Sequence, residues 1–266
     1  MKRLHLFEFM DQSWYPALFR RMQTDYLQFV VTRGSGHEQL IPLIKKALHH
    51  TRTTEIVDLC SGGTGPWLKL QPQLAAAGCP VTVKLTDKYP DPESVHKQTR
   101  YPNTQIEYLA ESVDAMQVPS QLRGMRMLFE GFHHFKPEQA QAILQDAAEH
   151  KMAIGIFEAG LKPPLSIPLL LLMPFLTLLG YWVITPGIRP RSLARIFWTY
   201  LVPIVPLVTI WDGIVSFLRV YSPPALKVLA DQIQVDGYVW EMGQVSAGTP
   251  LFAYIYLIGY PATEWE

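Results

Sequence analysis

The sequence predicts an α/β fold with a doubly wound, Rossmann-like seven-stranded sheet, and two patterns lead to it. In the middle of the chain, short apolar runs typical of buried strands alternate with helical segments, which indicates βαβ units and a parallel sheet. The last forty residues add two further strand-like runs. The 266 residues are enough for one large core. We therefore expect one domain that carries an insertion.

The chain begins with apolar side chains at helical spacing over residues 5–33. Pro16 is expected to interrupt this pattern, so residues 1–36 are predicted to form one or two amphipathic helices, whose apolar face is more often core than pocket. A further helix follows Gly36 and runs through Leu48.

The core of the predicted sheet lies in residues 37–160. Its five strands cover residues 55–60, 81–87, 106–109, 125–129 and 152–157, with a helix over 137–144 before the last. Residues 222–266 complete the core with a helix over 226–233 and strands over 238–240 and 251–258. We expect residues 243–250 to join these two strands as a hairpin-like connection.

Residues 161–221 form the insertion. Between Lys162 and Arg189 lie about 26 residues without an ionisable side chain, long enough to cross a hydrocarbon core of ~30 Å. Five prolines argue against one straight spanning helix, at positions 163, 164, 168, 174 and 186.

A re-entrant or monotopic hairpin, whose two ends return to the same side of the membrane, therefore fits the insertion better than a straight crossing. Its expected interface residues are the aromatic Tyr181, Trp182, Trp198 and Tyr200 and the basic Arg189, Arg191 and Arg195. The alternative is a soluble cap over the active site, buried against the N-terminal helices or a second copy of the chain.

The overall composition excludes few classes of protein. Lys and Arg together number 23, as do Asp and Glu, and no basic block occurs, which argues against nucleic-acid binding. Charged residues make up only 17%, below the roughly 25% of an average soluble protein. The deficit falls in the insertion.

The N-terminus has no cleavable leader pattern, so we expect a cytoplasmic protein with Cys60 and Cys79 reduced. No metal site is expected, because no Cys-x-x-Cys pair occurs. The adjacent His133 and His134 would point apart on a strand.

A glycine-rich turn follows the first predicted strand over residues 61–65, and Pro66 then opens a helix. Such a turn lets the backbone approach a ligand, and the helix N-terminus offers free N–H groups. Glycines also simply make tight turns. The turn alone is therefore a weak signal.

Acidic residues at the next strand ends strengthen the signal for a ligand site. Asp87 ends the second strand 22 residues after Gly65, where a carboxylate can accept both hydroxyls of a ribose. Asp114 follows the third strand. Together with Asp58, these acids place ligand-type side chains at three successive strand ends.

With these residues, the sequence resembles the class I S-adenosylmethionine-dependent methyltransferases over about residues 37–160 and, more loosely, the last forty. The resemblance implies S-adenosyl-L-methionine as cofactor, with its methionine part at Asp58 and the turn, its ribose at Asp87 and its adenine near Asp114. The residues assigned to cofactor binding are Asp58, Cys60, Ser61, Gly62, Gly63, Gly65, Asp87, Lys88, Tyr89, Val113, Asp114 and Ala115. The turn is one residue longer than the family pattern. The resemblance also implies that the N-terminal helices over residues 1–36 form a lid.

The end of the fourth strand falls where the family places residues that face the methyl group. Glu130, His133 and His134 are the candidates for a base that removes a proton from the acceptor. Alternatively, either histidine bonds a loop backbone.

A polar stripe follows the apolar insertion. Asp212, Ser216 and Arg219 share one helix face, and with Trp14 they are candidates for substrate binding. A structural pair of Asp212 and Arg219 is the alternative.

The resulting hypothesis is methyl transfer to a hydrophobic or lipid-like small molecule at the cytoplasmic membrane face. A homodimer is compatible with this hypothesis. The alternative is a non-catalytic protein of the same fold that serves as a membrane-associated scaffold or assembly protein. A nicotinamide dehydrogenase fits less well, because its Gly-x-Gly-x-x-Gly turn is missing.

Overall fold

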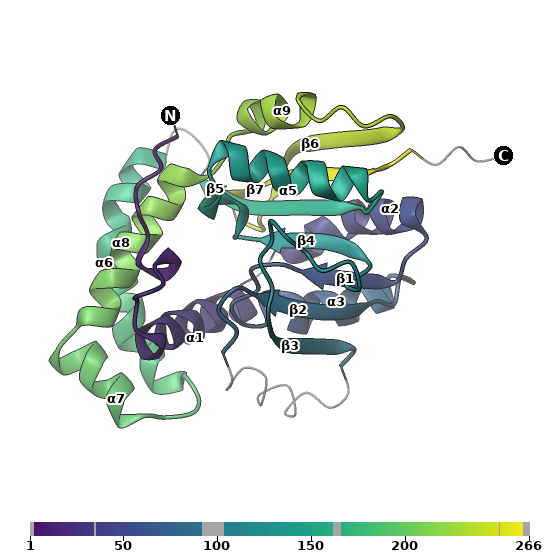
Figure 1. Cartoon of the computed structure of the whole chain (residues 1–266). Helices are drawn as coiled ribbons and strands as arrows, with labels where there is room; N and C mark the ends of the chain where they lie inside the picture. The colour runs from purple at the N-terminus through teal and green to yellow at the C-terminus, as the bar shows by residue number, and fades with distance from the viewer. Residues whose placement is uncertain (1–2, 35, 92–103, 162–165, 250, 263–266) are drawn as a thin grey trace. The chain divides into compact units, whose positions relative to one another are not determined.

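The computed structural model describes residues 3–34, 36–91, 104–161, 166–249 and 251–262. A seven-stranded sheet has the strand order β3-β2-β1-β4-β5-β7-β6 (Figure 1). Its strands are β1 Glu55–Asp58, β2 Thr82–Asp87, β3 Ile106–Ser112, β4 Met125–Phe129, β5 Ile154–Leu161, β6 Tyr238–Ser246 and β7 Phe252–Pro261. Strands β1 to β5 pair in parallel, whereas β6 and β7 pair antiparallel. The predicted fold class is confirmed.

The chain divides into two compact units, which we describe separately. Unit 1 comprises Met1–Gly34 and Leu161–Val220, and unit 2 comprises Ser35–Gly160 and Tyr221–Glu266. The N-terminal helices and the insertion therefore belong to one unit, although about 126 residues separate them in the sequence.

Unit 2 contains the whole sheet except the last residue of β5. Its helical elements are η2 His37–Leu40, α2 Ile41–Thr51, α3 Trp67–Ala76, η4 Phe132–His134, α5 Pro137–Glu149 and α9 Pro223–Asp231. Helices α2 and α3 pack on one face of the sheet, and α5 and α9 cover the other (Figure 1). Ile44, Trp67 and Met127 are fully buried in the core beneath α2 and α3. The strand order reverses between β1 and β4, which is where open α/β sheets bind ligands.

Strand β6 is longer than the sequence predicted. The expected connection over residues 243–250 is wrong at its start, because β6 continues to Ser246 and Gly243 pairs with Tyr256 of β7. A Cβ at Gly243 would lie 2.9 Å from the Tyr256 hydroxyl group. The glycine that suggested a turn thus makes room for a cross-strand tyrosine.

Unit 1 is helical. Its elements are η1 Phe9–Asp11, α1 Ala17–Arg33, α6 Ser166–Ile184, η5 Thr185–Gly187, α7 Leu193–Ile196, η6 Phe197–Leu201 and α8 Ile204–Arg219. The predicted break at Pro16 is confirmed, since this residue directly precedes α1.

The apolar insertion forms a longer helix than its prolines suggested. Helix α6 runs unbroken for 19 residues, although Pro174 lies inside it. Pro168 falls in the first turn, where its missing N–H costs nothing, and Pro186 follows the helix end. Lys162, Pro163 and Pro164 lie outside the described residues. Within the described residues, Ile167–Gly187 is long and apolar enough to cross a membrane, and α7 to η6 with α8 forms a second such segment bent by 71°.

Aromatic packing joins α6 to α1. The rings of Tyr26 and Tyr181 stack with centroids 3.8 Å apart, and the Tyr181 hydroxyl group lies 2.7 Å from that of Thr209 on α8. Tyr181 is only 2% exposed. Its predicted place at a membrane interface is therefore wrong.

Two other residues predicted at that interface also point inward. Arg195 is buried and forms an ion pair with Asp25 of α1. Trp198 packs edge to face against Phe19, with ring centroids 5.1 Å apart. Both side chains stabilise unit 1.

The polar stripe on α8 holds the N-terminal segment. The Asp212 carboxylate accepts hydrogen bonds from Phe9 N at 2.8 Å, Met10 N at 3.3 Å and the Gln23 amide at 3.1 Å. Arg219 donates to the Leu6 carbonyl group at 2.7 Å.

Arg219 also binds the carboxylates of Glu8 at 3.1 Å and Asp11 at 2.6 Å. The bonding capacity of both α8 side chains is largely used within unit 1.

Replacing Asp212 tests this packing. Asp212→Ala leaves two half-buried backbone N–H groups and the buried Gln23 amide without their acceptor, so we expect it to destabilise unit 1 by about 3 kcal/mol. The amides of Phe9 and Met10 should lose their protection from hydrogen exchange. Ser216→Ala is the matched control, because that hydroxyl group only bonds the carbonyl group of Asp212 in the same helix. Unchanged exchange in Asp212→Ala would contradict the structural role.

Candidate functional site

The glycine turn after β1 needs unusual backbone angles. Three of its residues have left-handed φ values, Cys60 at 59°, Gly62 at 58° and Gly65 at 50°. Glycine adopts this conformation without strain, whereas Cys60 does so at a cost. The turn is thus a shaped loop at the carboxyl end of β1.

Side chains from β1, β2 and β3 hold this turn. The Ser61 hydroxyl group donates to Asp58 at 2.6 Å, and Gly62 N donates to the Asp87 carboxylate at 2.8 Å. The Tyr108 hydroxyl group donates to the Gly62 carbonyl group at 3.0 Å. The backbone conformation of the turn therefore depends on three neighbouring strands.

Asp58 is buried beneath the turn. Among the described residues, its second carboxyl oxygen has no hydrogen-bond partner. The Trp67 indole N–H faces the same carboxyl group without reaching hydrogen-bond geometry. Burial raises the pKa of Asp58 to about 7, and the Ser61 and Trp67 donors offset this only in part. A buried, incompletely satisfied acid is costly for folding and is typical of a ligand site.

The second and third strand ends lie beside the turn. Besides Gly62, Asp87 binds Tyr89 N at 2.8 Å, yet an ionised carboxylate can accept about four hydrogen bonds, so it retains capacity for hydroxyl groups. Lys88 forms an ion pair with Asp114 at 2.8 Å. Desolvation acts to raise the pKa of Asp114, but Lys88 and the Met116 N–H outweigh it and lower the pKa.

Val113 and Ala115, on either side of Asp114, are buried. All twelve predicted cofactor residues thus lie in unit 2, and those with described contacts gather at the ends of β1, β2 and β3.

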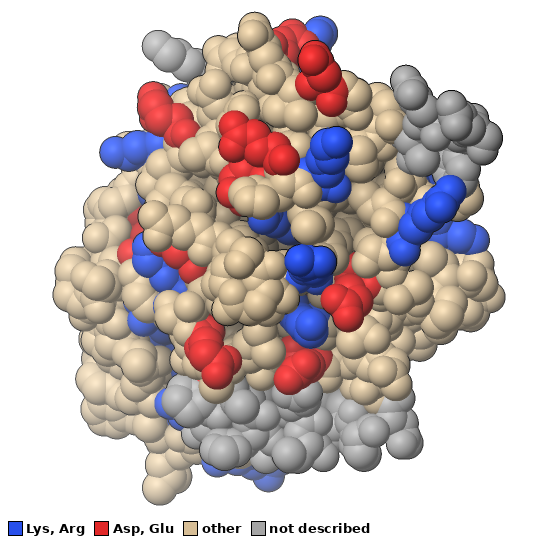
Figure 2. Space-filling view, turned by 45° about the vertical axis from the view of Figure 1, so that its right-hand side comes forward, with Lys and Arg blue, Asp and Glu red and all other residues tan. Residues whose placement is uncertain are grey.

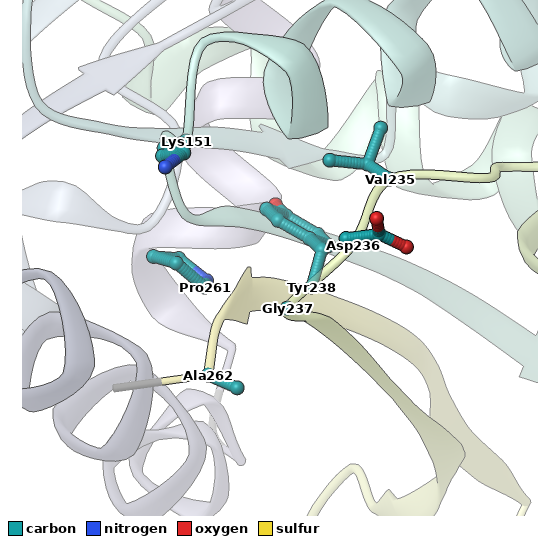
Figure 3. A pocket seen from close by; sticks show the side chains of 7 residues that line it. All are labelled: Lys151, Val235, Asp236, Gly237, Tyr238, Pro261 and Ala262. Atoms are coloured by element: carbon teal, nitrogen blue, oxygen red, sulfur yellow. The ribbon is translucent and has the colours of Figure 1, made fainter. Parts of the chain in front are cut away.

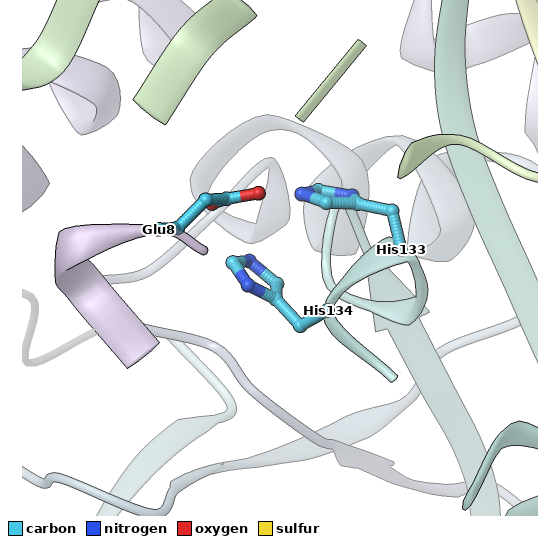
Figure 4. Close-up of side chains that lie close together, drawn as sticks. All are labelled: Glu8, His133 and His134. Carbon is cyan, nitrogen blue, oxygen red and sulfur yellow. The ribbon is translucent and has the colours of Figure 1, made fainter. Parts of the chain in front are cut away.

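The candidate bases follow β4. His133 and His134 lie on the short helix η4 with their rings side by side, centroids 4.3 Å apart (Figure 4). The expectation that they point apart on a strand is wrong, because β4 ends at Phe129. Glu130 has a left-handed φ of 51°, and its carboxylate accepts Ala159 N at 2.8 Å. Desolvation and the nearby Glu158 raise the pKa of the Glu130 carboxyl group, although the residue as a whole is exposed.

Glu158 of β5 is a residue that the sequence reasoning missed. One of its buried oxygens accepts Phe132 N at 2.6 Å and His133 N at 3.0 Å, and the other contacts His133 Nδ1 at 2.6 Å. If Nδ1 donates to this carboxylate, Nε2 is the ring nitrogen that can accept a proton. An acid inside the apolar run over 154–159 was the available signal.

The four predicted substrate residues all lie in unit 1. Trp14 is 66% exposed, and the Ser216 hydroxyl group bonds the Asp212 carbonyl group at 2.8 Å. Asp212 and Arg219 bind the N-terminal segment, as described above. Their role toward a substrate stays a prediction.

A pocket of about 260 Å³ lies elsewhere on unit 2 (Figure 3). Its lining residues are Lys151, Val235, Asp236, Gly237, Tyr238, Pro261 and Ala262. Lys151 lies three residues before the start of β5, so this pocket lies near the amino end of that strand. The predicted cofactor residues and the candidate bases lie at or after the carboxyl ends of their strands.

Surface charge is mixed on the face shown in Figure 2, where basic and acidic side chains are interspersed. That face offers no continuous basic field of the kind that binds a phosphate backbone.

No family model and no curated protein matches the chain. Several solved structures are similar to it. The crystal structure of human N-acetylserotonin methyltransferase in complex with S-adenosylmethionine is 14% identical, with a TM-score of 0.51, over 96% of this chain and 63% of that one. The trans-methyltransferase CalH is 14% identical, with a TM-score of 0.47, over 83% and 55%. The CMeT domain of the citrinin polyketide synthase is 11% identical, with a TM-score of 0.45, over 79% and 47%.

The chain thus spans less than two thirds of the length of these three proteins. The first similarity extends over nearly the whole chain and agrees with the strand order and the antiparallel β6–β7 pair. The chain has the fold of the class I S-adenosylmethionine-dependent methyltransferases.

Proposed function

We propose that this chain transfers a methyl group from S-adenosylmethionine to a hydrophobic or lipid-like small molecule. The observation that carries the proposal is the buried, incompletely satisfied Asp58 beneath a glycine turn, with Asp87 and Asp114 at the next two strand ends. A protein that only needs a stable sheet gains nothing from this arrangement.

The residues present fit this cofactor. An ammonium group suits the Asp58 carboxyl oxygen that has no partner among the described residues, hydroxyl groups suit Asp87, and the face of an aromatic ring suits the apolar Val113 and Ala115. Among the described residues, a Cβ at Gly65 would meet only the Trp67 side chain, at 4.0 Å, so this position of the turn is not crowded. When bound, S-adenosylmethionine would supply an electrophilic methyl group from its sulfonium centre.

The protein's own residues then position the acceptor and remove its proton where it has one. His133 is the best-placed base, because Glu158 fixes its orientation and leaves Nε2 basic. His134 and Glu130 are the further candidates.

Unit 1 supports the proposed acceptor class and location. In its apolar helix α6, Leu171 and Phe175 are each 71% exposed, which favours a hydrophobic substrate reached at the cytoplasmic face of a membrane. A soluble cap and a homodimer interface are the competing roles. A non-catalytic scaffold of the same fold is the alternative function.

Calorimetry with S-adenosylmethionine tests the proposal against the scaffold. We expect the wild type to bind the donor and Asp87→Ala to lose at least about tenfold in affinity, because hydroxyl acceptors are removed and the turn loosens. Glu107→Gln, an exposed change on the neighbouring β3, is the control. Absence of binding to the wild type at millimolar donor would refute the enzyme.

The raised pKa of Asp58 gives a pH test. Folding favours the protonated acid, so its ionisation lowers stability as pH rises from about 4 through 7. Asp58→Asn should therefore be more stable than the wild type at pH 8, by up to a few kcal/mol, with the gain vanishing near pH 4. Donor affinity of the wild type should rise through pH 7, because only the ionised acid attracts an ammonium group, and Asp58→Asn should lose this dependence. A wild-type affinity that is flat with pH would contradict this role of Asp58.

Removing the histidines tests the base. We expect His133→Ala or His134→Ala to lower the rate of label transfer from an isotopically labelled donor to cell extract at least about tenfold. Donor binding should survive, because neither side chain belongs to the predicted cofactor residues. Wild-type rates in both variants would rule out a histidine base.

A further inference from the structure

Unit 1 differs from unit 2 in both polarity and charge. Of the 25 large hydrophobic residues that are exposed among the described residues, 23 belong to unit 1. Unit 1 also has ten Lys and Arg against four Asp and Glu, a net charge of +6, whereas unit 2 has a net charge of −6. The zero net charge of the chain conceals this division.

The acids of unit 1 are all engaged inside it. Arg219 binds Glu8 and Asp11, Arg195 binds Asp25, and Asp212 accepts backbone N–H groups. The acids of unit 1 are therefore already engaged, while its basic residues outnumber them by six. Arg189 and Arg191, between α6 and α7, are both exposed.

Helix α6 presents an apolar stripe to the outside. Its exposed large residues are Ile167, Leu171, Leu172, Phe175, Leu176, Leu179, Trp182 and Val183. They recur at intervals of three and four, so they form one continuous face. A helix on the surface of a soluble protein carries polar residues there.

A second apolar stripe continues the first. Residues Leu193, Ile196, Phe197, Tyr200 and Leu201 are exposed at the same helical spacing along α7 and η6, and Ile204 and Leu207 are exposed at the start of α8, beyond the 71° bend. The Tyr200 hydroxyl group donates to the Trp182 carbonyl group at 2.8 Å, which brings the end of one stripe beside the other.

We propose that unit 1 docks on an anionic lipid bilayer, with the two stripes in the acyl boundary and Arg189 and Arg191 at the headgroups. Exposed apolar residues with a basic rim and amphipathic aromatic side chains match such a surface. A second copy of the chain fits less well, because an isologous contact would bring two units of charge +6 together.

The internal packing of unit 1 favours lying in the interface over crossing the bilayer. The other side of α6 packs through Tyr181 on Tyr26 of α1, and α1 carries Arg20, Arg21 and Gln28. A crossing α6 would draw this polar helix and the Asp25–Arg195 pair into the hydrocarbon core, at a high free-energy cost.

This inference deepens the membrane part of the proposed function and is independent of catalysis. The test is co-sedimentation of the full chain with vesicles of phosphatidylcholine alone or mixed with phosphatidylglycerol. We expect binding to the mixed vesicles, weakened at least about tenfold by the double change Arg189→Glu and Arg191→Glu. Phe175→Asn with Val183→Asn should also weaken it. Arg123→Glu with Lys227→Glu, which makes the same change of charge on exposed residues of unit 2, should not.

Any of three results would overturn the proposal. The chain could bind equally to both vesicle types, the arginine changes could leave vesicle binding unchanged, or the chain could form a soluble dimer that does not bind vesicles. Calorimetry with the donor on the same samples separates this outcome from the catalytic proposal, since loss of vesicle binding leaves donor binding intact.

Discussion

The site depends on the bonds that hold the glycine turn between β1 and β2. Gly62 N donates to Asp87, and Ser61 donates to Asp58, so the two acids shape the loop that they flank. Because parallel strands end at the same edge, these bonds also bring the third strand end within reach, through Tyr108 and its bond to Gly62. The strain at Cys60 and the burial of Asp58 are costs that the core beneath α2 and α3 has to offset.

The two units divide the tasks that we propose. Unit 2 buries its apolar residues and keeps polar groups at strand ends, as a cofactor-binding sheet requires. The acidic residues of unit 1 form internal contacts with Arg195, Arg219 and the N-terminal backbone, whereas many of its apolar residues are exposed. The buried polar contacts give unit 1 a defined structure, while its exterior suits an anionic membrane surface.

The sequence was informative where one local signal determined the structure. Alternating strands and helices predicted the sheet, and β4 ends at the predicted Phe129. Gly243 led to the wrong prediction of a turn, because a glycine in a strand and a glycine in a turn give the same sequence signal. Only the structure shows that Tyr256 lies across from it. Glu158 and the partners of Asp212 were missed for a different reason: they join segments 25 and about 200 residues apart, which no local pattern encodes. Pro174 was read as a helix breaker, yet the packing of α6 tolerates it.

Backbone NMR of the full chain during addition of S-adenosylmethionine tests the central claim most directly. The account predicts that the amides of Ser61, Gly62 and Gly63 shift together with that of Tyr89, while those of Asp236 and Gly237 at the separate pocket stay unchanged. Unshifted amides in the turn, or shifts confined to that pocket, would contradict it.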